Sequence, residues 1–148
     1  MKYEIREMQI DDYARSMALW KRCEGIGLSS ADDREPVQSF LAHNPGLCFI
    51  ALSAEKVIGT VLCGFDGRRG ALYHLAVDPA FRHQGIGEAL VTRCLEGLQR
   101  AGGQKCHLMV FQENTNAQAF YAQTGWYLRD NIVVMSKDLT CNADSSSC

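Results

Sequence analysis

What the sequence lacks excludes several classes of protein. The 148 residues contain no run of about 18 apolar residues, so no membrane-spanning helix is predicted. The first residues, MKYEIREMQIDDY, are charged and lack an apolar signal core, and we expect a cytoplasmic protein with no membrane partner. The net charge of −2 and the absence of a basic stripe argue against a general nucleic-acid-binding surface.

The sequence also lacks paired metal-ligand spacing. Its seven cysteines include no CxxC pair and no Cys/His spacing suited to zinc, so no metal site is predicted. We expect the five cysteines that lie in apolar stretches to be buried, reduced thiols. Cys141 and Cys148 flank a polar segment, so residues 140–148 are expected to be a disordered tail after a single domain over residues 1–139.

Apolar periodicity predicts the element order β-α-α-β-β-β-α-β-α-β-β. Helices are expected over 13–23, 35–44, 86–102 and 114–125, and strands over 2–8, 47–54, 56–65, 71–78, 105–111, 126–130 and 132–139. A strand, a helix and another strand in the middle predict a right-handed parallel crossover, and hairpins flank it. The fold expected is α/β (α+β), a mixed, mostly antiparallel sheet of six to seven strands with helices on both faces.

The segment DPAFRHQGIGEALV places two poor helix formers, Gly85 and Gly87, at the beginning of a helix. Glycines let backbone amides converge and let a ligand approach, and a helix N-terminus adds unpaired N–H groups and a positive dipole end. This pattern predicts a phosphate or diphosphate site, to which Arg82 and His83 would add charge. The alternative is a tight turn that only packs helix on sheet. Neither the P-loop pattern nor the third glycine of a dinucleotide fingerprint is present.

Two segments at family spacing resemble the GCN5-related N-acetyltransferases (GNAT). The first, after Val77, runs Arg82-His83-Gln84-Gly85-Ile86-Gly87 and is similar to the family's Arg/Gln-x-x-Gly-x-Gly/Ala signature. The second, ENTNAQAFYAQTGW, matches at Asn114, Ala117, Phe120, Tyr121 and Gly125, with Trp126 in place of the usual Phe. The resemblance runs from about Tyr3 to Leu139 and looks closest to the small ribosomal-protein N-terminal acetyltransferase-like group.

The resemblance implies the GNAT fold, in which the central parallel pair of strands splays apart. It also implies acetyl-CoA as cosubstrate and a primary amine of a small molecule or peptide as acceptor, attacking the thioester directly. The competing functions are a non-catalytic acyl-CoA sensor and a nucleotide-binding regulatory domain. A homodimer is possible, as in many family members.

The cofactor residues are carried over from the family segments. The amides of Gln84, Gly85, Ile86 and Gly87 would hold the diphosphate beside Arg82 and His83. The backbone of Leu75, Ala76 and Val77 would pair with the pantetheine arm like an added half-strand. Asn114 would bind that arm or cap its own helix, and Ala117, Phe120 and Tyr121 complete the expected set. Tyr121 is the predicted general acid for the departing thiolate, with a role as an amphipathic core residue as the alternative.

The general base is not fixed by the motifs. Many relatives carry a Glu at the position of Met109, which this chain lacks. Strand alternation puts His107, Met109 and Phe111 on one face, and it puts Tyr73 on the face opposite to His74. His107 and Tyr73 are therefore candidates, and a water chain to a backbone carbonyl or to Glu113 is the alternative.

The loop over residues 23–35 is the expected acceptor side of the site, because relatives vary there. Its carboxylates at Asp32, Asp33 and Glu35 would attract a cationic amine. They could equally be helix-start carboxylates that face water.

Overall fold

The structure is a computed structural model that describes residues 2–140. These residues fall into two compact units, one up to Thr115 and one from Asn116 onward, which are described separately below. The predictions made for the tail beyond residue 140, including Cys141 and Cys148, lie outside the described residues.

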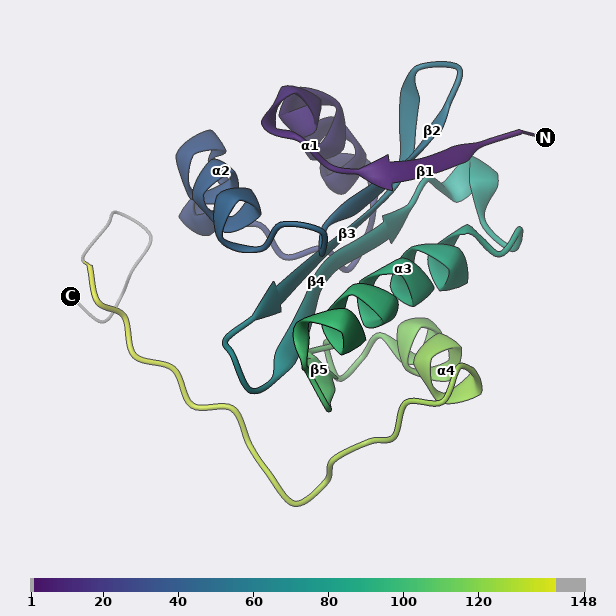
Figure 1. The fold of residues 1–148 in the computed structure, drawn as a ribbon. Coiled ribbons are helices and arrows are strands. Elements are labelled where there is room, and N and C mark those ends of the chain that lie inside the picture. Colours follow the sequence, from purple (N-terminus) through teal and green to yellow (C-terminus); the bar gives the residue numbers. More distant parts are fainter. Residues whose placement is uncertain (1, 141–148) are drawn as a thin grey trace. The chain divides into compact units, whose positions relative to one another are not determined.

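The first unit is built on a five-stranded sheet with the order β1-β2-β3-β4-β5 (Figure 1). Its strands are β1 (Glu4–Glu7), β2 (Phe49–Ser53), β3 (Lys56–Phe65), β4 (Gly70–Val77) and β5 (Cys106–Leu108). The first four strands pair antiparallel with their neighbours, and β4 pairs with β5 in parallel. The predicted mixed sheet with one parallel pair is therefore confirmed.

Helices lie on both faces of this sheet, as the sequence predicted. The helices α1 (Tyr13–Arg22) and α2 (Arg34–His43) cover one face, and α3 (Ile86–Ala101) covers the other (Figure 1). Residues 2–140 also form three short 3-10 turns, η1 (Ile10–Asp12), η2 (Ser30–Asp32) and η3 (Pro79–Phe81). Because α3 connects the parallel strands β4 and β5, its N-terminus lies beyond the end of β4, where the glycine-rich loop is.

Each face of the sheet has its own apolar core. On the α3 face Ile86, Leu90, Cys94 and Leu98 recur every fourth residue and are all buried, which confirms the predicted helical stripe. On the other face the indole of Trp20 is 1% exposed and packs with Leu19, Val37 and Leu62. Burying a side chain of this size contributes about 1.5–3 kcal/mol, so these stripes fix the helices on the sheet.

The five cysteines within residues 2–140 are free thiols, and four of them are buried. The expectation of buried thiols therefore holds for four of the five, and Cys106 in the short edge strand β5 is only partly buried. Burial raises the pKa of the Cys48 thiol to about 11, so this group stays protonated and unreactive at neutral pH.

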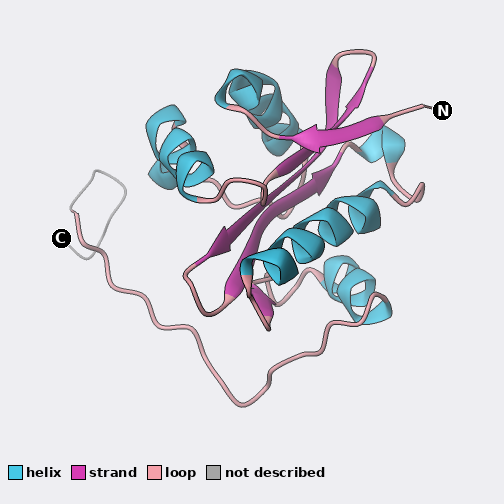
Figure 2. Cartoon of the chain, viewed as in Figure 1, coloured by secondary structure: helices cyan, strands magenta, loops and turns pink. Residues whose placement is uncertain are grey.

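The second unit contains most of α4 (Thr115–Gln123) and an extended segment after it. The strands predicted over 126–130 and 132–139 are not formed, so the sheet has five strands instead of six to seven (Figure 2). Large apolar side chains in this segment are exposed, Leu128 at 83% and Met135 at 90%. A segment rich in β-favouring residues becomes a strand only when another strand pairs with it. None of the five described strands pairs with residues 126–139. Within residues 2–140, no helix has the length and apolarity that crossing a bilayer requires.

Candidate functional site

The parallel strands β4 and β5 separate partway along the sheet. They pair only from Gly70↔Cys106 to Leu72↔Leu108, although β4 continues to Val77. Beyond Leu72, β4 has β3 on one side and no described strand on the other. The backbone of residues 73–77 is therefore an open edge, to which an extended ligand can add main-chain hydrogen bonds. Leu75, Ala76 and Val77, predicted to bind the pantetheine arm, lie on this edge.

A β-bulge lies at the point of separation. The register of β3 against β4 changes from Thr60↔Ala76 to Leu62↔Tyr73, so His74 and Leu75 together oppose Val61. His74 has a φ of 51°, in the left-handed region that residues other than glycine rarely adopt. Such bulges bend a strand and redirect its side chains.

The bulge overturns the prediction that Tyr73 and His74 point to opposite faces. The ring of Tyr73 packs edge-on against Phe40 of α2, with centroids 5.9 Å apart. The ring of His74 lies 4.8 Å from Trp20 of α1. Both side chains therefore lie on the face covered by α1 and α2, because strict alternation fails where two residues oppose one.

A buried hydrogen-bonded chain supports the bulge. The indole Nε1 of Trp20 donates to Thr60 Oγ1 at 2.8 Å, and this hydroxyl donates to the backbone oxygen of His74 at 2.9 Å. Trp20 and Thr60 are at most 1% exposed, so the indole N–H depends on the Thr60 hydroxyl for its hydrogen bond.

The loop between β4 and α3 is anchored by Asp78. This carboxylate accepts from the Ala80 amide at 3.0 Å and from the Arg22 guanidinium at 2.9 Å, and Lys56 lies 3.4 Å away. Burial raises the pKa of Asp78, but these hydrogen bonds outweigh it and hold the pKa below its usual range. Asp78 is thus a charged anchor that ties the loop to α1 and β3.

The predicted anion site is a row of backbone amides. His83 and Gly85 have left-handed φ values of 63° and 81°, which turn the chain into α3. From Arg82 to Glu88 no backbone N–H donates to any described residue, and the residues from Arg82 to Gly85 are exposed. Consecutive free amides at a helix N-terminus attract anions. Gln84, Gly85, Ile86 and Gly87 all contribute to this row.

The Arg82 side chain is turned back onto the strand end. Its Nε donates to the Val77 backbone oxygen at 3.1 Å, and its guanidinium also contacts the Cys23 thiol. His83 is exposed beside it. Both predicted cationic residues therefore lie at the amide row.

The two candidates for the general base, His107 and Tyr73, lie at different positions relative to the point where β4 and β5 separate. His107 pairs with Ala71, within the part where the strands are still joined. Met109 and Phe111 follow the end of β5 and are 69% and 54% exposed. Tyr73, 41% exposed, lies just past the last pair on β4. The structure thus places Tyr73 at the separation and His107 before it.

The loop over residues 23–33 reaches the segment that follows β5. A methyl group at Gly27 would lie 3.3 Å from the Phe111 ring, and one at Gly25 would lie 2.8 Å from the Asn114 side-chain amide. Asn114 directly precedes α4, and its backbone N–H donates to the Phe111 oxygen at 2.9 Å. The loop predicted to form the acceptor side therefore touches both sides of the open edge, since its Asp32 also meets His74 at 2.6 Å.

The three acidic candidates of the loop that was predicted over residues 23–35 have different surroundings. Asp32 is buried and its carboxylate already accepts the Ser29 amide at 2.9 Å. Asp33 and Glu35 are exposed at the beginning of α2, where the helix dipole favours negative charge. The contact of Asp32 with His74 was missed by sequence reasoning, because no local pattern marks the bulge that turns His74 toward the loop.

In the second unit the aromatic residues of the second motif form a small cluster. The Tyr121 ring lies 5.1 Å from Phe120 and 5.6 Å from Trp126, both edge-on. Trp126 also donates its backbone N–H to the Tyr121 oxygen at 3.0 Å. The Trp that replaces the family's usual Phe thus contacts Tyr121, and Ala117 lies one turn earlier on α4. The roles assigned to these residues stay predictions.

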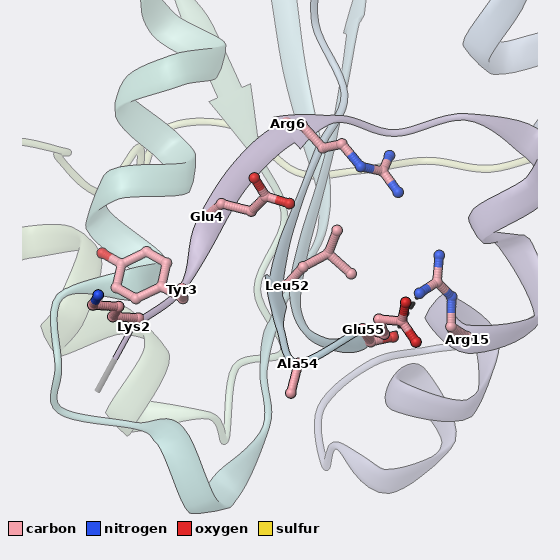
Figure 3. Close-up of a pocket in the computed structure, with 8 residues that line it drawn as sticks. All are labelled: Lys2, Tyr3, Glu4, Arg6, Arg15, Leu52, Ala54 and Glu55. Carbon is pink, nitrogen blue, oxygen red and sulfur yellow. Dashed lines mark hydrogen bonds between the residues drawn. The ribbon is translucent and has the colours of Figure 1, made fainter.

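A hollow of about 810 Å³ opens elsewhere, between β1, the β2–β3 hairpin and α1 (Figure 3). Its Arg6 and Arg15 both bind the carboxylate of Asp12, at 2.8 and 2.7 Å, and Arg15 also donates to the Glu55 backbone oxygen. These cations are therefore already paired. None of the glycine-loop residues or open-edge residues lines this hollow.

Comparison with known proteins agrees with this geometry. Residues 6–126 match the model of the acetyltransferase (GNAT) family. An acetyltransferase of Sodalis glossinidius is 33% identical over 136 residues, covering 92% of this chain and 95% of the relative.

Solved structures show the same fold. A PaiA N-acetyltransferase from Thermoplasma acidophilum, in complex with coenzyme A, superposes with a TM-score of 0.78 at 19% identity, over 89% of this chain and 94% of that one. An aminoglycoside acetyltransferase from a soil metagenomic sample, in complex with sisomicin, gives a TM-score of 0.71 at 20% identity, over 93% and 97%.

The chain belongs to the acetyltransferase (GNAT) family. It is therefore an acetyltransferase that uses acetyl-CoA as its cosubstrate. The free amides after β4 and the open backbone edge of β4 fit the two parts of that molecule that need hydrogen bonds, its diphosphate and its amide-containing arm.

Proposed function

We propose that this protein transfers the acetyl group of acetyl-CoA to a primary amine of a small molecule or peptide, by direct attack of the amine on the thioester. The observation that carries the proposal is the row of unpartnered amides from Arg82 to Glu88, which follows an open strand edge over residues 73–77 after the short turn η3. One ligand with a diphosphate at one end and amides along an extended arm satisfies both.

Binding is assigned to backbone groups. The amides of Gln84 to Gly87 hold the diphosphate, with Arg82 and His83 adding positive charge. The backbone of Leu75 to Val77 pairs with the arm as an added strand would. Side-chain identity matters little at the open edge, whereas the left-handed conformation of Gly85 matters at the loop.

The proposed reaction is an acetyl transfer from sulfur to nitrogen. A neutral amine nitrogen attacks the thioester carbonyl carbon, a C–N bond forms and the C–S bond breaks. The nitrogen gives up one proton to a base, and the departing sulfur receives one from an acid. Tyr121 is our proposed acid, since its phenol is the one ionisable side chain among the residues that match the second family motif. The products are an N-acetylated amine and free coenzyme A.

An acetyl-transfer screen tests the proposal. The purified chain is incubated with acetyl-CoA and representatives of five amine classes: peptide N-termini, lysine side chains, polyamines, amino acids and aminoglycosides. Thiol release and acetylated product are then measured together. We expect both to appear in equal amounts for at least one class.

Two results would overturn it. Thermal stabilisation by acetyl-CoA with no product from any class would identify a non-catalytic acyl-CoA sensor. Stabilisation by ATP or NAD instead of acetyl-CoA would identify a nucleotide-binding domain. A ligand present at 100 times its Kd adds about 2.7 kcal/mol to the free energy of unfolding, which a thermal-shift panel detects.

A further inference from the structure

His74 and Asp32 form a pair at the place where β4 and β5 separate. His74 lies two residues past the last paired residue, Leu72. Its Nε2 lies 2.6 Å from Asp32 Oδ1, and the two side chains are only 14% and 12% exposed. The pair therefore stands in a largely desolvated position beside the open edge that is assigned to the cosubstrate's arm.

The carboxylate of Asp32 is held in one orientation. Its second oxygen accepts the Ser29 amide at 2.9 Å, and the Asp32 backbone oxygen accepts the Tyr13 hydroxyl at 2.6 Å. A carboxylate only accepts hydrogen bonds, so a neutral imidazole must present its N–H to it from Nε2. The lone pair of the neutral ring is then on Nδ1, which contacts no described polar group.

The backbone of His74 is held in a conformation that is otherwise unfavourable. Its φ of 51° belongs to a region that is unfavourable for a residue other than glycine. The Thr60 hydroxyl fixes its carbonyl, and Trp20 packs on its ring. The bulge thereby holds the His74 ring on the face of the acceptor-side loop, at the level where β4 loses its second neighbour.

We propose that His74 is the base that takes the proton from the acceptor amine, and that Asp32 is a positioning residue that fixes its tautomer. This inference rests on the proposed acetyl transfer. As the amine nitrogen bonds to the acetyl carbon, its proton passes to Nδ1 of His74, and the resulting imidazolium stays paired with Asp32. The proton later leaves to solvent, which restores the neutral ring. A base that is oriented by a buried hydrogen-bond acceptor is a common arrangement for proton transfer.

This assignment also places the acceptor amine. It enters on the α1/α2 face, between His74 and the loop over residues 23–33, whose other end touches Phe111. His107, the sequence-based candidate, lies opposite Ala71, before the strands separate. His74 is thus better placed for the proton than His107.

The test uses the whole chain and an alkylamine that the wild type acetylates. His74→Asn keeps a residue that tolerates a left-handed backbone but removes the base. We expect kcat to fall at least about 100-fold with saturating acetyl-CoA, the usual contribution of a general base. Coenzyme A affinity and melting temperature should stay close to the wild type. His74→Gln provides a second variant, and His43→Gln, at an exposed histidine of α2, is the matched control that should keep full activity.

A second acceptor separates proton transfer from loop positioning. An aromatic amine is neutral at the assay pH and its proton becomes acidic as the bond forms, so it depends less on a base. We expect the loss in His74→Asn to shrink to below about tenfold with this acceptor, and added imidazole to restore part of the activity with the alkylamine.

Asp32→Asn tests the positioning role. The amide must keep its oxygen toward the Ser29 N–H, so it presents its NH₂ to His74 and forces the ring proton onto Nδ1. We expect a loss of kcat of at least about tenfold at unchanged coenzyme A affinity.

The proposal is overturned if His74→Asn and His74→Gln keep activity within about threefold of the wild type. It is also overturned if both amines lose activity equally and imidazole restores none, since the pair would then only hold the loop. A wild type that acetylates no amine at all would instead overturn the proposed function, and with it this assignment.

Discussion

The guanidinium of Arg22 lies 2.9 Å from the buried carboxylate of Asp78. Arg22 is the last residue of α1, and Asp78 follows the last residue of β4. This ion pair therefore joins the end of the helix before the acceptor-side loop to the beginning of the glycine-rich loop. The two loops that frame the proposed site share one anchor.

Removing the charge of Asp78 is expected to destabilise the first unit. Asp78→Asn leaves Arg22 and Lys56 without their anion and weakens the cap on Ala80, and we expect a loss of about 1–3 kcal/mol in the free energy of unfolding. Urea unfolding followed by circular dichroism measures it. Asp66→Asn is the control. The Asp66 carboxylate lies in the exposed turn after β3 and accepts only from the amides of that turn. Equal effects of the two changes would contradict the anchoring role.

The same ion pair predicts a pH dependence. The pKa of Asp78 lies below its usual range in the folded chain, so its stabilising contribution is complete above the unfolded pKa of about 3.9. It is lost as the pH falls through the lower folded pKa. The wild type should therefore lose its advantage over Asp78→Asn as the pH falls below about 4. A stability difference that stays constant into the acid range would show that the charge is not the cause.

At the glycine loop, charge and backbone conformation can be separated at one position. Gly85 has a φ of 81°, and a methyl group there would meet nothing within 4 Å. Asn and Asp both tolerate this conformation, and their side chains have the same size and shape. Gly85→Asp therefore differs from Gly85→Asn only by a negative charge. A like charge about 4 Å from the diphosphate is unfavourable by about 4 kcal/mol, so we expect Gly85→Asp to bind coenzyme A more than 100-fold more weakly than Gly85→Asn.

Titration calorimetry with coenzyme A provides the comparison, and thermal unfolding checks that both variants are folded. Equal affinity of the two variants would mean that no anion binds at these amides.

Tyr121→Phe tests the proposed general acid. The change removes one hydroxyl and leaves the ring contacts with Phe120 and Trp126 in place. We expect coenzyme A affinity to stay within about threefold and kcat to fall about 100-fold, the lower end of the usual contribution of acid catalysis. Stopped-flow thiol release measures the chemical step. If kcat is unchanged, the proton reaches the sulfur from another source.

The hydroxyl of Thr60 contacts the bulge of β4, since it donates to the His74 backbone oxygen. Thr60→Val keeps the shape of the side chain but leaves the Trp20 indole N–H buried without an acceptor, and we expect a loss of about 1–3 kcal/mol in stability. Thr60→Ser keeps the hydroxyl and should lose less. Because Thr60 also fixes the His74 carbonyl, Thr60→Val should lower kcat as well. A stability loss in Thr60→Val with full activity would show that the bulge is held without this chain.

Much of the fold was predictable because it depends on local periodicity. The apolar residues of α3 recur every fourth position, and the predicted range over 86–102 ends one residue beyond the observed helix. The glycine loop was also predictable, because Gly85 cannot be replaced freely at a positive φ and the helix that follows must expose its first amides. Strand pairing is not local, and so the two strands expected after residue 125 were wrong although their residues favour β structure.

The sequence by itself determined the helices, the hairpins of the sheet, the parallel crossover and the glycine-rich loop, since each follows from a pattern within a short segment. Only the tertiary structure decided which side chains meet at the separated strands. One extra residue in the pairing of β4 with β3 turns His74 to the face of Tyr73 and brings it within 2.6 Å of Asp32, 42 residues away in the chain. A shift in register of that kind reverses the facing of a side chain without leaving a mark in the residues around it.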